Sequence, residues 1–248
     1  MINLQQYGWN EELFRQKQNS EYKDFKHGRV TVTHKTCYEV IAESGHYVCE
    51  LTGNMLYGKE VSEYPCTGDW VIFQDIDTDK GIIFDILPRQ KTLYRLKSGT
   101  VSEKQAIASF IDKAFIVQSL DDNFNVRRME RFMLQVAGEN IQPVLVLTKT
   151  DLGFNKTEVE KPLSHVSDKI PVFYTSTESP ESIETLRQFI FPGETVVFTG
   201  SSGVGKSTLI NALCGQQVLQ TGVISNSTGK GKHTSTRREM VLMPASAY

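Results

Sequence analysis

The 248-residue sequence has few cysteines, and their spacing excludes the usual cysteine frameworks. They stand far apart, with no Cys-x-x-Cys pair, at Cys37, Cys49, Cys66 and Cys214. This spacing indicates neither a zinc site nor a disulfide framework. We therefore expect free thiols in a reducing, cytoplasmic compartment.

Long apolar runs and a strong net charge are also missing. No apolar run approaches the length of a membrane span, and the first residues lack the basic segment and apolar core of a signal peptide. The formal net charge of −2 gives no global nucleic-acid signature, so RNA binding would depend on local patches. A hydrophobic content of 39% is still globular, and the length suits one large domain or two ordinary ones.

What the sequence does contain is a phosphate-binding motif between an expected strand at 194–199 and an expected helix at 208–214. It fits G-x-x-x-x-G-K-[ST] and comprises Gly200, Ser201, Ser202, Gly203, Val204, Gly205, Lys206, Ser207 and Thr208. The glycines let backbone N–H groups converge on phosphate oxygens, and the helix N-terminus adds partial positive charge. We expect Lys206 to reach the β- and γ-phosphates and Ser207 to ligate Mg²⁺.

The first part of the chain reads as a short helix over residues 3–22, followed by about five short strands between residues 28 and 87. Glycine corners between these strands favour a small closed barrel, most commonly an OB-fold. OB-folds often bind oligonucleotides by stacking bases on aromatic side chains, which here could be Tyr38, Tyr47, Tyr57, Trp70 and Phe73. The alternating pattern predicts that at least half of them are core.

A basic connector at 88–97, with Arg89, Lys91, Arg95 and Lys97, either contacts phosphates or is a solvated linker.

The later part alternates strands and helices. Strands are predicted at 113–118, 143–147, 171–175 and 194–199, with helices at 126–136, 156–168 and 182–191 between them. Such units form a parallel sheet that binds ligands at the carboxyl ends of its strands.

A second motif, Thr148-Lys149-Thr150-Asp151-Leu152, follows the 143–147 strand. It resembles the guanine motif N-K-x-D of GTPases, with Thr148 in place of Asn. The Asp151 carboxylate would accept both N1–H and the 2-amino group of guanine, a donor pair that adenine lacks. Lys149 would lie along the base or brace the phosphate loop, and Ser176 stands where GTPases carry a base-contacting loop. Because base recognition precedes phosphate recognition, the domain is predicted to be circularly permuted.

With these motifs in this order, the chain resembles the RsgA (YjeQ) family of circularly permuted GTPases. The resemblance is carried by Trp9-Asn10, Gly28-Arg29-Val30, residues 68–71, 91–95, 124–125, 130–132, 148–152 and 200–208, and by the switch-like segment 229–237. It implies an N-terminal helix and OB-fold RNA-binding domain with a basic linker over 1–95, and a circularly permuted P-loop GTPase domain over 96–248. The implied partners are GTP or GDP with Mg²⁺, the small ribosomal subunit and its rRNA, in a cytoplasmic monomer that does not bind membranes.

In the switch-like segment, Thr234 is expected to complete the Mg²⁺ shell, with Thr236 as the next choice. His233 could orient or deprotonate the attacking water, or could instead face solvent or rRNA.

No D-x-x-G follows Lys206, so we expect a GTPase domain shortened at its C-terminal end. The family's zinc-binding C-terminal domain is likewise not expected, and with it no zinc ligand. Two alternatives to a GTPase stay open: a nucleotide- and RNA-binding module that does not hydrolyse, and a P-loop ATPase or small-molecule kinase.

Overall fold

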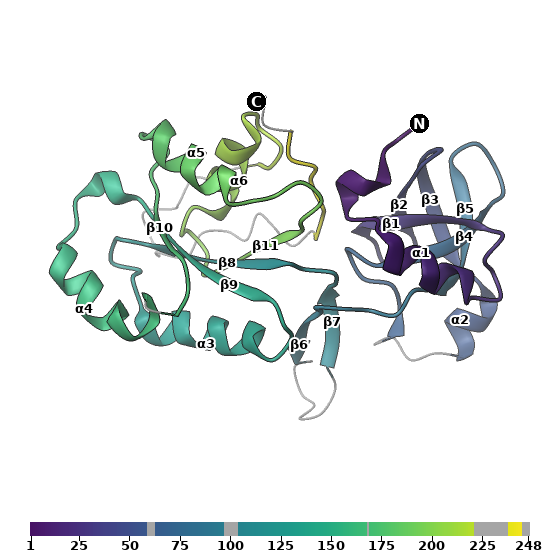
Figure 1. The fold of residues 1–248 in the computed structure, drawn as a ribbon, viewed down its shortest axis with the longest axis horizontal. Coiled ribbons are helices and arrows are strands. Elements are labelled where there is room, and N and C mark those ends of the chain that lie inside the picture. Colours follow the sequence, from purple (N-terminus) through teal and green to yellow (C-terminus); the bar gives the residue numbers. More distant parts are fainter. Residues whose placement is uncertain (59–62, 97–103, 168, 221–237, 245–248) are drawn as a thin grey trace. The chain divides into compact units, whose positions relative to one another are not determined.

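The computed structural model describes residues 1–58, 63–96, 104–167, 169–220 and 238–244 (Figure 1). The chain divides into two compact units. The first comprises Met1–Ile111, Pro192–Thr195 and the described residues 238–242, and the second comprises the rest. The boundary predicted between residues 95 and 96 falls inside the first unit and stays a prediction.

A closed barrel forms the body of the first unit, as predicted. Its strands are β1 (Lys26–Thr33), β2 (Tyr38–Ala42), β3 (Gly45–Leu51), β4 (Trp70–Asp75) and β5 (Lys80–Ile86), in the order β1-β2-β3-β5-β4. A short helix, α2 (Gly53–Gly58), follows β3. Four of the five aromatic residues named as base-stacking candidates are buried in this unit, and only Tyr57 is exposed. Tyr38, Tyr47 and Phe73 belong to the barrel core, whereas Trp70 packs in a second buried cluster with Leu4 and Leu13.

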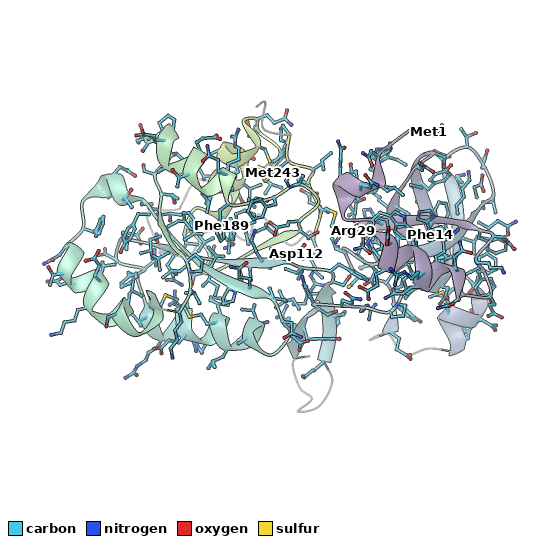
Figure 2. The ribbon with its side chains drawn as sticks, viewed as in Figure 1. Met1, Phe14, Arg29, Asp112, Phe189 and Met243 are labelled. Atoms are coloured by element: carbon cyan, nitrogen blue, oxygen red, sulfur yellow. The ribbon has the colours of Figure 1, made fainter. Side chains whose placement is uncertain are left out.

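The N-terminal segment differs from the single helix predicted over residues 3–22. A 3₁₀ turn, η1 (Leu4–Tyr7), ends at Gly8, whose φ of 89° is left-handed. The helix α1 (Glu11–Gln18) then begins anew, with the Asn10 side chain accepting a hydrogen bond from the Leu13 N–H. The buried guanidinium of Arg29, labelled in Figure 2, donates to the Tyr7 carbonyl and so ties this turn to β1.

The basic connector forms a structure that charge alone did not reveal. It leads into β6 (Leu93–Leu96), which pairs with β7 (Lys104–Ala108) in an antiparallel ribbon. Arg89 is neither solvated nor free for phosphates, because its Nη2 atom lies 2.8 Å from Oδ2 of the fully buried Asp69. Ser109 also donates to Asp69, at 2.5 Å. The Gly68-Asp69 corner of the barrel thus holds the start of the ribbon by a buried, fully partnered ion pair.

The second unit is built on a parallel sheet in the order β10-β9-β8-β11. These strands are β8 (Lys113–Ser119), β9 (Gln142–Thr148), β10 (Val172–Tyr174) and β11 (Val196–Thr199). Helices α3 (Val126–Ala137) and α4 (Lys156–Ser167) lie on one side of the sheet, and α5 (Pro180–Gln188) and α6 (Lys206–Cys214) lie on the other (Figure 1). Every residue of β8 is buried, as expected for a central strand covered on both faces.

The residues of the core between the sheet and helices α5 and α6 show to which face of the sheet each side chain of β8 points. Phe115 and Val117 pack there with Leu186 and Leu209. Phe189 and Met243, both labelled in Figure 2, pack against the same core. Because side chains alternate along a strand, Ile116 and Gln118 face the α3 side of the sheet.

Candidate functional site

The turn between β11 and α6 has the backbone of a phosphate-binding loop. Gly200, Gly203 and Gly205 adopt φ values of 149°, 80° and 89°. A Cβ atom on Gly200 would collide with the Val117 carbonyl oxygen on β8, so this position requires glycine. Val204 is completely buried, which anchors the loop in the core. Lys206 and Ser207 therefore begin α6 at a helix N-terminus, where backbone N–H groups favour an anion.

The Lys206 ammonium lies inside this loop. Its Nζ atom donates to the carbonyl oxygens of Gly200 at 3.0 Å and Ser201 at 2.5 Å. Burial lowers the pKa of Lys206, because the charged form loses hydration. Both partners are neutral, and no ion pair of Lys206 with a carboxylate is found among the described residues. A phosphate would supply the counter-charge that this ammonium lacks, using its third N–H donor.

The second motif touches the phosphate loop through Thr148. This residue ends β9, is 6% exposed, and donates from Oγ1 to the Val204 carbonyl at 2.7 Å. The Gln118 carbonyl lies 3.3 Å from the same hydroxyl, but the single proton serves the shorter bond. A threonine at the asparagine position of N-K-x-D therefore joins the end of β9 to the loop that begins α6.

Lys149 is held by an ion pair that the sequence did not predict. Its backbone is left-handed, with φ of 61°, and its Nζ lies 2.7 Å from Oδ2 of Asp121. Burial alone would raise the pKa of Asp121. Hydrogen bonds from Lys149, Ser119 and the Asn123 N–H outweigh that effect and lower it to about 2. Asp121 therefore stays ionised and fixes the direction of the Lys149 side chain.

The predicted base-recognition residues lie together at the carboxyl ends of β9 and β10. The Ser176 hydroxyl donates to Oδ1 of Asp151. Ser176 is 5% exposed, whereas Asp151 is open to solvent. The Thr150 N–H donates to the Thr175 carbonyl at 3.4 Å, which brings the two loops side by side. One carboxylate oxygen of Asp151 is thus oriented by the protein, and the described residues leave the other without a hydrogen-bond partner.

Two of the predicted catalytic residues lie outside the part of the chain that the structure describes. His233 and Thr234, with the whole segment 229–237, fall outside the described residues. Within the described part of the chain, no group of three or more His, Cys, Asp and Glu side chains is arranged to hold a metal ion. In that same part, no helix has the length and apolar character needed to cross a membrane.

A hollow of about 450 Å³ is lined by residues of α5 and α6, including Glu184 and Arg187. It includes no residue of the phosphate loop. The candidate site is instead defined by the contacts of Lys206, Thr148 and Asp151.

Comparison with known proteins gives a consistent result. A family model described as RsgA GTPase matches residues 86–248. The small ribosomal subunit biogenesis GTPase RsgA 1 of Bacteroides thetaiotaomicron is 65% identical over 98% of this chain and 69% of its own length. RsgA of Methanosarcina acetivorans is 36% identical over 97% of this chain, which covers 64% of that relative.

Solved structures show the same fold. The crystal structure of YjeQ from Thermotoga maritima is similar with a TM-score of 0.59 and 24% identity, covering 75% of this chain and 64% of that one. A second solved structure, YloQ, described as a circularly permuted GTPase, has a TM-score of 0.57 at 22% identity and covers 79% of this chain and 66% of that one. The chain spans about two thirds of the length of the curated relatives it matches. On the strength of the family match and of these relatives, the chain belongs to the RsgA GTPase family.

Proposed function

We propose that this chain binds GTP, hydrolyses it to GDP and phosphate, and acts in late assembly of the small ribosomal subunit. It would bind rRNA of that particle and leave it on hydrolysis. Membership of the RsgA GTPase family and the similarity to small ribosomal subunit biogenesis GTPases support this proposal. The observation that carries it is the 2.7 Å bond from Thr148 to the Val204 carbonyl, because it joins the base motif and the phosphate loop in one site.

In this proposal each part of the nucleotide meets a different element. Asp151, oriented by Ser176, accepts the two guanine donors beyond the end of β9. The Gly200–Thr208 loop surrounds the phosphates with backbone N–H groups, while Lys206 neutralises part of their charge. Catalysis then consists of positioning and charge stabilisation, and His233 orients or deprotonates the attacking water.

The residues present fit a nucleotide-bound Mg²⁺ ion. Such ions keep several waters and bind phosphate oxygens plus one or two protein oxygens, so a dedicated carboxylate cage is not needed. Ser207, in the first turn of α6, would supply one such hydroxyl, and Thr234 would be the second ligand. When bound, the ion neutralises charge that develops on the β- and γ-phosphate oxygens.

Single-turnover hydrolysis tests the proposal. The chain is loaded with γ-labelled GTP, and phosphate release is measured with and without small ribosomal subunits. We expect the particle to accelerate release, by on the order of tenfold or more if it completes the charge stabilisation. Binding of GTP without stimulated release would leave only the non-hydrolysing nucleotide- and RNA-binding module. Equal competition by ATP and GDP would favour a P-loop ATPase or kinase instead.

A further inference from the structure

An arginine on α3 is bonded to the phosphate loop. Nη1 of Arg128 donates to Oγ of Ser201 at 2.7 Å. The Arg128 backbone N–H donates to the Asn125 side chain at 2.9 Å, which caps the start of α3. Because α3 packs on β8 and β9, a rigid element of the fold holds this arginine beside the loop.

The charge of Arg128 has no counter-charge in the described part of the chain. No ion pair between this guanidinium and a carboxylate is found there, in contrast to Lys149, which is paired with Asp121. Among the described residues, its side chain donates one hydrogen bond, to a neutral hydroxyl, and a guanidinium has five N–H donors. The side chain is half-buried, so its charge is less screened by water than that of an exposed arginine.

The surface of the sheet beneath this contact is polar as well. Thr199, the last residue of β11, is in register with Ile116, and Gln118 lies two residues further along β8, on the face that α3 covers. Gln118 is fully buried, and neither its Nε2 nor its Oε1 atom has a hydrogen-bond partner among the described residues. An apolar residue at this position would avoid the cost of burying that amide without a partner. Arg128 and Ser201 thus form a polar contact at the loop, and Gln118 is a further buried polar group on the α3 side of the sheet.

We propose that Arg128 is a positioning residue that favours a nucleoside triphosphate over the diphosphate at this loop. The inference rests on the proposed function and names a determinant of its specificity. The hydrogen bond fixes the Ser201 side of the loop, and the positive charge, which no described carboxylate pairs, lowers the energy of the added γ-phosphate charge. Since the guanidinium contacts Ser201, it acts through the loop and through its field.

Nucleotide titrations test this inference. GDP and a non-hydrolysable GTP analogue are titrated into the wild-type chain and into Arg128→Gln, Arg128→Lys and Arg127→Gln. Arg127 is the matched control, because it is an exposed neighbour on the same helix and its loss changes the net charge equally. We expect Arg128→Gln to weaken binding of the analogue about fivefold and of GDP less than twofold. Arg128→Lys should recover most of the loss, and Arg127→Gln should bind like the wild type.

Salt dependence separates the charge of Arg128 from a purely structural role. In the wild type, the preference for the triphosphate analogue should fall as salt rises, and in Arg128→Gln it should fall less. A wild-type preference in Arg128→Gln, or an equal loss in Arg127→Gln, would overturn the inference while leaving the proposed function intact. If Arg128→Gln does not fold, Arg128→Met, which keeps the aliphatic stem and removes the charge, takes its place in both titrations, with the same expected loss and the same overturning result. A wild-type chain that binds neither nucleotide would overturn the proposed function and this inference with it.

Discussion

At the scale of single residues, the carboxylate of Asp151 is the group on which guanine selectivity depends. We expect Asp151→Asn to weaken GTP binding at least tenfold, because an amide offers only one acceptor to two guanine donors. Binding of xanthosine triphosphate should improve, since the amide donor matches the extra carbonyl of xanthine. Competition against a labelled guanine nucleotide measures both changes. Asp122→Asn is the matched control, because Asp122 is an exposed carboxylate in the same unit. Unchanged selectivity in Asp151→Asn would remove this residue from the proposed site.

The sequence predicts backbone conformation well where that conformation depends on neighbours in the chain. The glycines of the phosphate loop were assigned from local spacing, and the left-handed backbone of Gly205 agrees with that motif. The contacts of Arg128 and Asp121 could not be assigned, because they form only when α3 and the end of β8 dock against the loops. Charge alone was misleading for Arg89. Its partner Asp69 directly precedes β4, 20 residues earlier in the chain. No sequence pattern around either residue indicates that the two side chains meet.

At the scale of elements, the N-terminal segment is attached to the barrel through a stacked histidine. The rings of His27 and Trp9 lie 4.0 Å apart, and Trp9 also contacts Trp70 at 4.9 Å. Burial and the charge of Lys17 lower the pKa of His27 to about 4, from 6.5. The neutral ring is thus favoured in the folded state. Its contribution to stability is fully present above about pH 6.5 and is lost as the pH falls toward 4.

This pKa gives a prediction for the element. Between pH 7 and pH 4, the wild type should lose roughly 1–2 kcal/mol more unfolding free energy than His27→Phe, after allowance for partial exposure of the ring. Phenylalanine keeps the stacking on Trp9 but does not titrate. Urea unfolding followed by tryptophan fluorescence measures the difference at each pH. Parallel pH profiles for the two proteins would show that His27 is not the titrating group.

Elements were predicted best where one pattern dominates. The barrel strands and β8 alternate or run apolar over their whole length, and they form where expected. The prediction of a single helix over residues 3–22 was wrong. Gly8 turns the chain in a left-handed conformation, which the spacing of apolar residues does not reveal. The ribbon strand β7 has only one buried residue, so no periodicity indicated it. This strand forms because its backbone pairs with β6 in the antiparallel ribbon.

At the scale of the whole molecule, each unit has a core of its own. Val71 and Phe73 belong to the barrel core of the first unit, and Phe115 and Val144 to the sheet core of the second. The motif order in the sequence predicted a circularly permuted GTPase fold, and the solved structures similar to this chain confirm it. That success has a physical basis, because both motifs directly follow strands whose carboxyl ends meet at one edge of a parallel sheet.

The two cores lead to a prediction about heat unfolding. We expect two calorimetric transitions, because each unit buries its own apolar surface, and guanine nucleotide with Mg²⁺ should raise only the one that reports the second unit. At a ligand concentration of 100 times Kd, binding adds about 2.7 kcal/mol, which raises that transition by roughly 5–10 °C. Lys206→Ala should abolish the shift, because the loop then lacks its ammonium, while ATP should produce little shift in the wild type. An equal rise of both transitions in the wild type and in Lys206→Ala would mean that the nucleotide stabilises the chain somewhere other than the phosphate loop.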